Sequence, residues 1–220
     1  MKNLLIIFLF LISEINAANI CSPDPTPRFS KFIKVHSGAR TINIKWSGNE
    51  KGVIKTYKKP GPFGSYLSLD LPFESFKSVY DQLKVDYVNL KSRGEAHITL
   101  VTPVEFHCLF KPAGTSIDQI EKSIHEYLKS HPNMLKFELD SIGSHQLDEL
   151  ETFFIIVKSD DFMKLRKQLE LLPNQGFVAN KFYPHITLGF TDRDLHSSDG
   201  VIKDNEHSRD GRYNLVIESL

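Results

Sequence analysis

The sequence predicts an α+β protein in which strands and helices alternate along the chain. Two observations support this prediction. Apolar residues recur at every second position in several short segments, which indicates strands, and at every third or fourth position in longer segments, which indicates amphipathic helices. The tetrapeptide His-Ile-Thr-Leu (HITL) also occurs twice, at 97–100 and at 185–188. Each copy lies on an expected strand that follows an expected helix.

In the first half of the chain, a hairpin, a helix and one further strand are expected. Ile42, Ile44 and Trp46 alternate with polar residues, and the Ser-Gly-Asn turn after them predicts a hairpin into the next strand. A proline ahead of an apolar stripe predicts the start of a helix. The expected elements are strands at 42–46, 53–57 and 67–71, a helix at 73–83 that opens after Pro72, and the strand at 96–101 with the first HITL.

The second half repeats the order of strand, helix and HITL strand. Ser116 and Gln119 form the pattern of a capping box ahead of an apolar stripe. A run of apolar residues at 153–157 predicts a strand buried on both faces, and Asp160 is expected to cap the helix after it. The expected elements are a helix at 117–127, strands at 135–139 and 153–157, a helix at 160–172, the second HITL strand, a polar loop or lid at 191–212, and a last strand at 213–217.

The first residues predict a secretory signal peptide. Lys2 precedes a short apolar run, and a polar, small-residue segment follows it up to Ala17. Residues 1–17 are therefore expected to be removed from a secreted, extracellular protein, with a retained signal anchor as the alternative. The proline-rich residues 18–39 are expected to form an extended linker. Residues 40–220 are expected to form one domain with lobes at roughly 40–110 and 111–220, without a membrane span.

Charge and cysteine content narrow the range of partners. The chain has 27 Lys and Arg residues and 27 Asp and Glu residues. A neutral total argues against a protein that coats long nucleic acid, since such binding depends on excess positive charge. Lys59 ends a locally basic segment and is expected to attract phosphate; a cluster of solvated lysines is the alternative. Cys21 and Cys108 lack the spacing of a zinc site, but they can pair in an oxidising compartment.

The two HITL copies suit acid–base chemistry on a phosphate. Alternate residues of a strand share one face, so His97 lies beside Thr99 and His185 beside Thr187. If the two strands lie side by side, two imidazoles and two hydroxyls converge on one cleft. Histidine can act as acid or base near neutral pH, and a hydroxyl can donate to a phosphate oxygen where charge develops. This set needs no metal or other cofactor.

The motifs in their context resemble a known superfamily. Paired HxT motifs of this kind are similar to those of the two-histidine (2H) phosphoesterases. The first motif, RGEAHITLVTP at 93–103, resembles the fungal Swiss army knife branch, and the second, PHITLGF at 184–190, resembles the usual second motif. The resemblance covers roughly residues 66–190. It implies a bilobal 2H phosphoesterase fold, with two pseudo-symmetric α/β lobes around a central cleft, and activity on 2′,3′-cyclic phosphates or RNA ends.

The predicted protein is thus a metal-independent phosphodiesterase that acts as a monomer on a nucleotide or short RNA. His97 and His185 are expected to be the acid and the base, in either order, with Thr99 and Thr187 as phosphate ligands. Two alternatives remain open: a ribonuclease that leaves a cyclic phosphate, and a secreted protein that binds nucleotides or phosphate without turnover.

Further candidates flank these motifs. Tyr183 and Phe190 lie beside the second motif, where an aromatic ring can stack on a nucleobase. Core packing is the alternative for these aromatic residues. The other seven histidines are expected to be surface or structural residues; for His107 and His145, a place near the cleft is the alternative.

Overall fold

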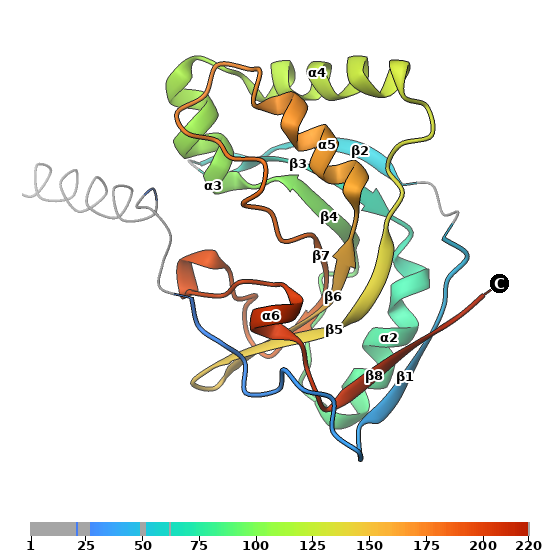
Figure 1. The fold of residues 1–220 in the computed structure, drawn as a ribbon. Coiled ribbons are helices and arrows are strands. Elements are labelled where there is room, and N and C mark those ends of the chain that lie inside the picture. The colour runs from blue at the N-terminus through green and yellow to red at the C-terminus, as the bar shows by residue number, and fades with distance from the viewer. Residues whose placement is uncertain (1–20, 22–26, 49–51, 62, 220) are drawn as a thin grey trace, which may run out of the picture.

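The computed structural model describes residue 21 and residues 27–48, 52–61 and 63–219. The predicted signal peptide lies outside these residues. The described chain is a mixed α+β protein with several small sheets (Figure 1). The strands are β1 (Arg40–Lys45), β2 (Val53–Lys58), β3 (Ser65–Leu71), β4 (Ala96–Val101), β5 (Glu138–Leu147), β6 (Leu150–Lys158), β7 (His185–Phe190) and β8 (Tyr213–Glu218). The α-helices are α2 (Phe73–Asp86), α3 (Pro103–Glu105), α4 (Ile117–Ser130), α5 (Asp160–Leu169) and α6 (Asn205–Ser208).

The two larger sheets each carry one HITL copy on an edge strand. Their antiparallel strand orders are β2-β3-β4 and β5-β6-β7, so β4 and β7 are the edges that hold the motifs. β4 and β7 contact each other without being hydrogen-bonded neighbours in a sheet. The expected meeting of the two motif strands is therefore observed. The division into lobes near residue 110 stays a prediction.

The predicted hairpin between the strands at 42–46 and 53–57 is wrong. β1 pairs in parallel with β8, with Ile42 opposite Leu215, and β2 pairs with β3. Gly48 has a φ of +70°, a left-handed conformation suited to a turn. A turn reverses the chain, however, without requiring the strands on either side to pair. Ile42 and Ile44 are buried in the core, where β1 contacts α2.

Several predicted boundaries also differ from the structure, among them the end of α5 at Leu169 in place of residue 172, and two of the differences have a local cause. The strand expected at 135–139 begins at Glu138, because Leu135 has a φ of +84°, which lies outside the extended region. Ser159, and not Asp160, caps α5: its hydroxyl accepts a hydrogen bond from the Phe162 amide at 3.1 Å.

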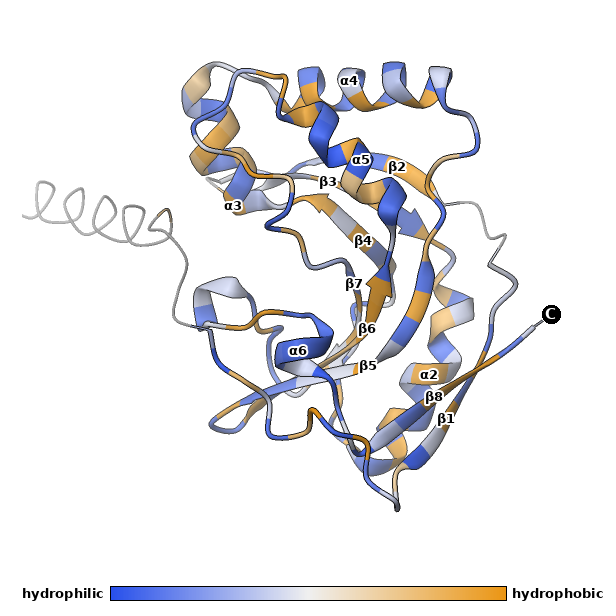
Figure 2. Cartoon of the chain, viewed as in Figure 1, coloured by the Kyte–Doolittle hydropathy of each residue, from blue (hydrophilic) through white to orange (hydrophobic). Residues whose placement is uncertain are grey.

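The helix patterns and the core agree with the sequence. α2 buries Phe76, Val79 and Leu83, and α4 begins at the expected capping box. Figure 2 shows hydrophilic and hydrophobic residues interspersed along α4, as in an amphipathic helix. Ile98 of β4 and Ile186 of β7 are both fully buried. Since burying an aliphatic side chain stabilises the fold by ~1.5–3 kcal/mol, each motif strand is anchored by its apolar face.

The described part of the predicted linker lies against the C-terminal part of the chain. The Ser30 amide donates to the His207 carbonyl at 2.7 Å, and the Phe29 and His207 rings stack. Cys21 forms a disulfide with Cys108, with Cα atoms 5.5 Å apart. The disulfide joins the N-terminal segment to the π-helical turn that follows β4 and α3.

Candidate active site

The first motif presents His97 and Thr99 on the partly exposed face of β4. Ile98 and Leu100 on the opposite face are fully buried. This alternation is the one expected from the sequence. β3 lies beside β4 and places Asp70 opposite His97.

The second motif repeats this arrangement on β7. His185 and Thr187 are partly exposed, whereas Ile186 and Leu188 are buried. β6 lies beside β7 and places Phe154 opposite Thr187. Both copies therefore present histidine and threonine on one face and anchor the strand with the other.

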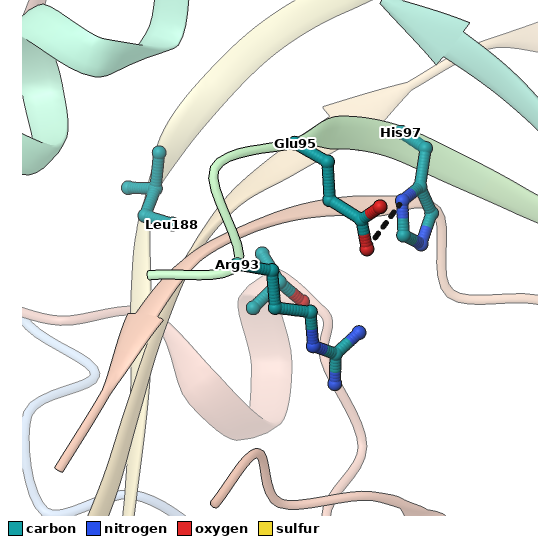
Figure 3. Close-up of a pocket in the computed structure, with 5 residues that line it drawn as sticks. Arg93, Glu95, His97 and Leu188 are labelled. Atoms are coloured by element: carbon teal, nitrogen blue, oxygen red, sulfur yellow. Dashed lines mark ion pairs between the residues drawn. The ribbon is translucent and has the colours of Figure 1, made fainter. Parts of the chain in front are cut away.

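A small pocket lies where the two motif strands meet. Its lining comes from both copies and from the bend before β4: Arg93, Glu95, His97, Thr187 and Leu188 (Figure 3). His97 of one copy and Thr187 of the other thus face the same space. Gly94 has a φ of +68°, which favours glycine, and it allows the bend that carries Arg93 and Glu95 to the pocket. Thr99 and His185 share faces with these residues but do not line the pocket.

The His185 ring has a defined hydrogen-bond partner. Its Nδ1 lies 2.7 Å from the carbonyl oxygen of Tyr183. Because a carbonyl only accepts, Nδ1 carries the hydrogen, and Nε2 of the neutral ring is the acceptor. Burial and the nearby Lys203 ammonium lower the pKa of His185 to about 3. The ring is therefore neutral at physiological pH and can take up a proton at Nε2.

The surroundings of His97 are acidic. Its Nδ1 lies 3.8 Å from the Glu95 carboxylate, and its side chain is 13% exposed. Burial lowers the pKa of His97, but the negative charges of Glu95 and Asp70 oppose this shift. The two histidines consequently differ in how readily they hold a proton.

A buried carboxylate, Asp194, lies beside the second motif. Its side chain is 2% exposed and accepts hydrogen bonds from Thr152 at 2.6 Å, from Thr187 at 3.2 Å and from the Lys203 ammonium at 2.9 Å. The Arg93 guanidinium lies 3.4 Å away. Burial alone would raise the pKa of Asp194, but Lys203 and the hydrogen bonds hold it well below its usual range. Asp194 is therefore a permanent negative charge that orients Thr187 and Arg93.

Asp194 also links the two histidines electrostatically. Its negative charge favours the protonated form of both His97 and His185. A third histidine, His196, has its Nδ1 3.9 Å from Asp194 and acts on the pKa of His185 as well. The polar stretch at 191–212 was expected to be a surface loop or a lid. It instead contributes buried residues, Asp194 and Lys203 among them, to the site.

The three predicted substrate-binding residues lie outside the pocket. Tyr183 is 39% exposed, and its backbone carbonyl contacts the His185 ring. Phe190 ends β7, at the opposite end of the strand from His185, with the Arg93 guanidinium 5.7 Å from its ring centroid. Lys59 is exposed, and its ammonium lies 5.5 Å from the Tyr57 ring.

Two tyrosines that the sequence analysis did not select lie on the same sheet face as His97. The Tyr66 ring centroid is 6.1 Å from that of His97, and Tyr66 stacks on Tyr57 with centroids 4.4 Å apart and planes 5° from parallel. Burial raises the pKa of Tyr66 to about 12, so its hydroxyl stays protonated and remains a donor. Alternation along a strand predicts which residues face outward, but it does not say which strand lies next to which.

The remaining candidate histidines have other surroundings. His145 is buried on β5, where burial, followed by the charges of Arg28 and Lys203, lowers its pKa. The His107 ring packs 4.8 Å from that of Phe63.

The described residues offer no obvious metal site. Their His, Cys, Asp and Glu side chains form no group of three or more that could hold an ion. In the same part of the chain, the helices are too short or too polar to cross a bilayer.

His97 of one HxT strand and Thr187 of the other line one pocket, and the family to which the chain is similar is recognised over this region. A family model described as "Swiss Army Knife, 2H phosphoesterase domain" matches residues 65–196, which is more than half of the 220 residues. The chain therefore belongs to the 2H phosphoesterases, and this membership implies a phosphoesterase activity. No curated protein and no solved structure matches the chain.

Proposed function

We propose that this protein is a secreted, metal-independent phosphodiesterase that hydrolyses 2′,3′-cyclic nucleotide phosphates or phosphodiesters at RNA ends. One observation carries the proposal: His97 from the first motif and Thr187 from the second line the same pocket, with Arg93 beside them. Hydrolysis of a phosphodiester needs a group that transfers a proton, and it is helped by a hydroxyl and a fixed positive charge that bind the phosphate oxygens.

In this mechanism the two imidazoles divide the proton transfers. One takes a proton from water as the water oxygen attacks phosphorus. The other gives a proton to the ribose oxygen as its bond to phosphorus breaks, and the product is a phosphomonoester. Each transfer is expected to contribute about 10²- to 10⁴-fold in rate.

Hydroxyl and guanidinium groups would hold the non-bridging oxygens. The Thr187 hydroxyl donates its single hydrogen to Asp194 in this structure. It can turn that hydrogen toward a phosphate oxygen, because Asp194 keeps Thr152 and Lys203 as partners. Arg93 would supply positive charge on the same side, and Thr99 would bind from β4 in a bilobal arrangement.

The face of the first sheet supports a nucleotide as substrate. Tyr66 lies beside His97, and the ammonium of Lys55 lies 4.7 Å from the Tyr57 ring. Aromatic and basic side chains together are typical of sites for single-stranded nucleic acid. Lys59 extends the positive charge of this face, and Tyr183 is a candidate contact from the other motif.

The disulfide supports secretion. A bond between Cys21 and Cys108 is characteristic of an oxidising compartment, because the cytosol keeps thiols reduced. Expression of the full chain tests this proposal: the protein should be recovered from the medium, beginning near Ala18, with the disulfide formed.

Metal-free turnover tests the activity. The mature protein is incubated in EDTA with the four 2′,3′-cyclic nucleotides and with a short RNA that ends in a cyclic phosphate. Turnover by the wild type and none by the folded His97→Ala/His185→Ala variant is the expected result. Equal turnover by the two proteins would refute the proposal.

The same assay separates the alternatives. An RNA product that still bears a cyclic phosphate would indicate a transesterifying ribonuclease. Nucleotide binding by calorimetry without any product would indicate a sequestering protein.

A further inference from the structure

The charged groups around His97 differ from those around His185, and this difference indicates which ring is the general acid and which is the general base. We propose that Glu95 and Asp70 are positioning residues that keep the reactive proton on His97, so that His97 is the general acid and His185 the general base. The inference rests on the proposed function and deepens it. It goes beyond the repeated motif, in which the two histidines are equivalent.

The charged groups that face His97 are mostly acidic. Glu95 lies 3.8 Å from Nδ1, and Asp70 lies opposite His97 on β3. Asp194 adds a third negative charge, and Arg93 the opposing positive one. Figure 3 shows the Glu95 carboxylate directed at the His97 ring. A carboxylate only accepts, so it favours the ring with hydrogen on Nδ1, and protonation then places the second hydrogen on Nε2.

Asp70 is held as a carboxylate by its own neighbours. The Tyr57 and Ser68 hydroxyls both donate to it at 2.7 Å, and the Lys55 ammonium lies 3.4 Å away. Burial by itself raises the pKa of Asp70, but these hydrogen bonds and the ammonium lower it. The negative charge opposite His97 is therefore present throughout the physiological pH range.

The groups that face His185 favour the neutral ring. After burial, Lys203 and His196 act against its protonation, whereas the hydrogen bond to the Tyr183 carbonyl and the charge of Asp194 act in favour. The charge of Asp194 is offset by the Lys203 ammonium at 2.9 Å. The Tyr183 carbonyl fixes hydrogen on Nδ1, which leaves the Nε2 lone pair for a proton from water. Burial lowers the pKa of both rings, and that of His185 falls to about 3.

In the hydrolytic step, His185 then takes up a proton and His97 gives one up. The water oxygen bonds to phosphorus while Nε2 of His185 takes the water proton. The bond from phosphorus to the ribose oxygen breaks while His97 gives its Nε2 proton to that oxygen. His97 ends neutral and His185 protonated, and proton exchange with solvent restores the starting state.

The nature of the leaving group separates acid from base. His97→Ala and His185→Ala are compared on a nucleoside phosphodiester that releases a ribose-like alcohol and on the matching p-nitrophenyl ester, whose phenolate leaves without a proton. His97→Ala should lose about 10²- to 10⁴-fold on the alcohol ester and little on the aryl ester. His185→Ala should lose activity on both. The reverse pattern would overturn the assignment.

The carboxylate is tested by Glu95→Gln, with Glu149→Gln at the exposed β5–β6 turn as the matched control. The pH dependence of kcat/KM reports the free enzyme. Loss of a charge 3.8 Å from His97 should move the alkaline limb down by about half to one pH unit and leave the acidic limb in place. The control should move neither limb. An unmoved alkaline limb, or a shift of the acidic limb alone, would contradict the proposal.

A titration of the protein alone keeps this inference separate from the proposed function. Imidazole resonances are followed by NMR from pH 3 to 8 and assigned with the two alanine variants. The His97 signal should titrate at higher pH than the His185 signal, and Glu95→Gln should lower only the first. If no phosphodiester is turned over, the proposed function fails while this result stands. If His185 titrates at the higher pH, the inference fails whatever the activity.

Discussion

The two HITL copies have the same sequence and the same strand geometry, yet they lie in different electrostatic surroundings. In the first copy, His97 faces the carboxylates of Glu95 and Asp70. In the second, His185 lies near the Lys203 ammonium, and its Nδ1 is bound to a backbone carbonyl. The strand repeat places the histidine and threonine of each copy on one face of its strand, whereas residues from other elements decide which protonation state each histidine prefers.

The charged residues that cause this difference come from several parts of the chain. Glu95 is two residues from His97 along the chain, whereas Asp70 comes from β3, and Asp194 and Lys203 come from the stretch after β7. The difference between the two copies can therefore be tested in three ways: by substitutions in the motifs, by substitutions in the contacts that hold the surrounding segments together, and by a change of pH.

Removal of either histidine should have the largest effect. His97→Ala and His185→Ala are each expected to lower kcat for a 2′,3′-cyclic nucleotide by about 10²- to 10⁴-fold. Because the two groups act as a unit, the double variant should lose less than the product of the single losses. Steady-state kinetics give the three values, and circular dichroism checks that each variant is folded. Fully multiplicative losses would indicate that the two rings act in separate steps.

Loss of the buried Arg166 should weaken the connection between the first copy and the segment that leads into the second. Its guanidinium donates to the carbonyl of Leu100 at 2.7 Å and to that of Ala179 at 3.1 Å, and it pairs with Glu105 at 2.6 Å. Arg166→Met leaves the carboxylate and the carbonyls without their partner and should lower the free energy of unfolding by about 3–5 kcal/mol. Urea denaturation measures the change.

The matched control is Lys164→Met, on the same helix but with a side chain that is 61% exposed. It should change the free energy of unfolding by less than about 0.5 kcal/mol. Equal changes in the two variants would show that Arg166 does not hold β4 against the segment before β7.

The disulfide should stabilise the region next to the first copy. The Cys21–Cys108 bond closes a loop of 87 residues. Its removal by Cys21→Ser/Cys108→Ser should cost about 2–5 kcal/mol, chiefly because the unfolded chain is less restricted. Reductant should shift the urea midpoint of the wild type to the same extent and leave that of the double variant unchanged. A wild type indifferent to reductant would contradict the predicted role.

The effect expected to be smallest near neutral pH is a pH dependence of stability, because it develops only on acidification. His185 has a folded-state pKa of about 3, below the ordinary value of 6.5. The unfolded chain therefore binds the proton first, and stability is lost as pH falls from about 6.5 toward 3, by at most ~1.4 kcal/mol per pH unit. His185→Gln should show a shallower loss over this window, because it cannot be protonated there. Equal slopes for the two proteins would show that His185 is not held neutral by the fold.

Much of the site's local geometry could be predicted from the sequence. The alternation around His97 and His185 correctly predicted which residues are exposed, because it depends on short-range periodicity, which a single sequence contains. The meeting of the two motif strands was only a condition in the argument from the residues, and the expectation of a shared cleft came from the family resemblance.

The features that were wrong or missed depend on contacts between distant segments. The pairing of β1 with β8 joins residues 40–45 to residues 213–218, and a local turn gave no sign of it. Asp194 and Lys203 looked like residues of a polar loop, because burial of an ion pair depends on what packs around it. Arg93 and Glu95 were part of the recognised motif context, but only the bend at Gly94 shows that they line the pocket.

The central claim is that His97 and His185 act on one phosphate. The most direct measurement is an NMR titration of ¹⁵N-histidine-labelled protein with adenosine 2′- and 3′-monophosphate, which resemble the expected products. The account predicts that both imidazoles shift along a single saturation curve with one nucleotide bound, and that the bound anion raises both pKa values. A shift of only one ring, or two curves with different affinities, would contradict it.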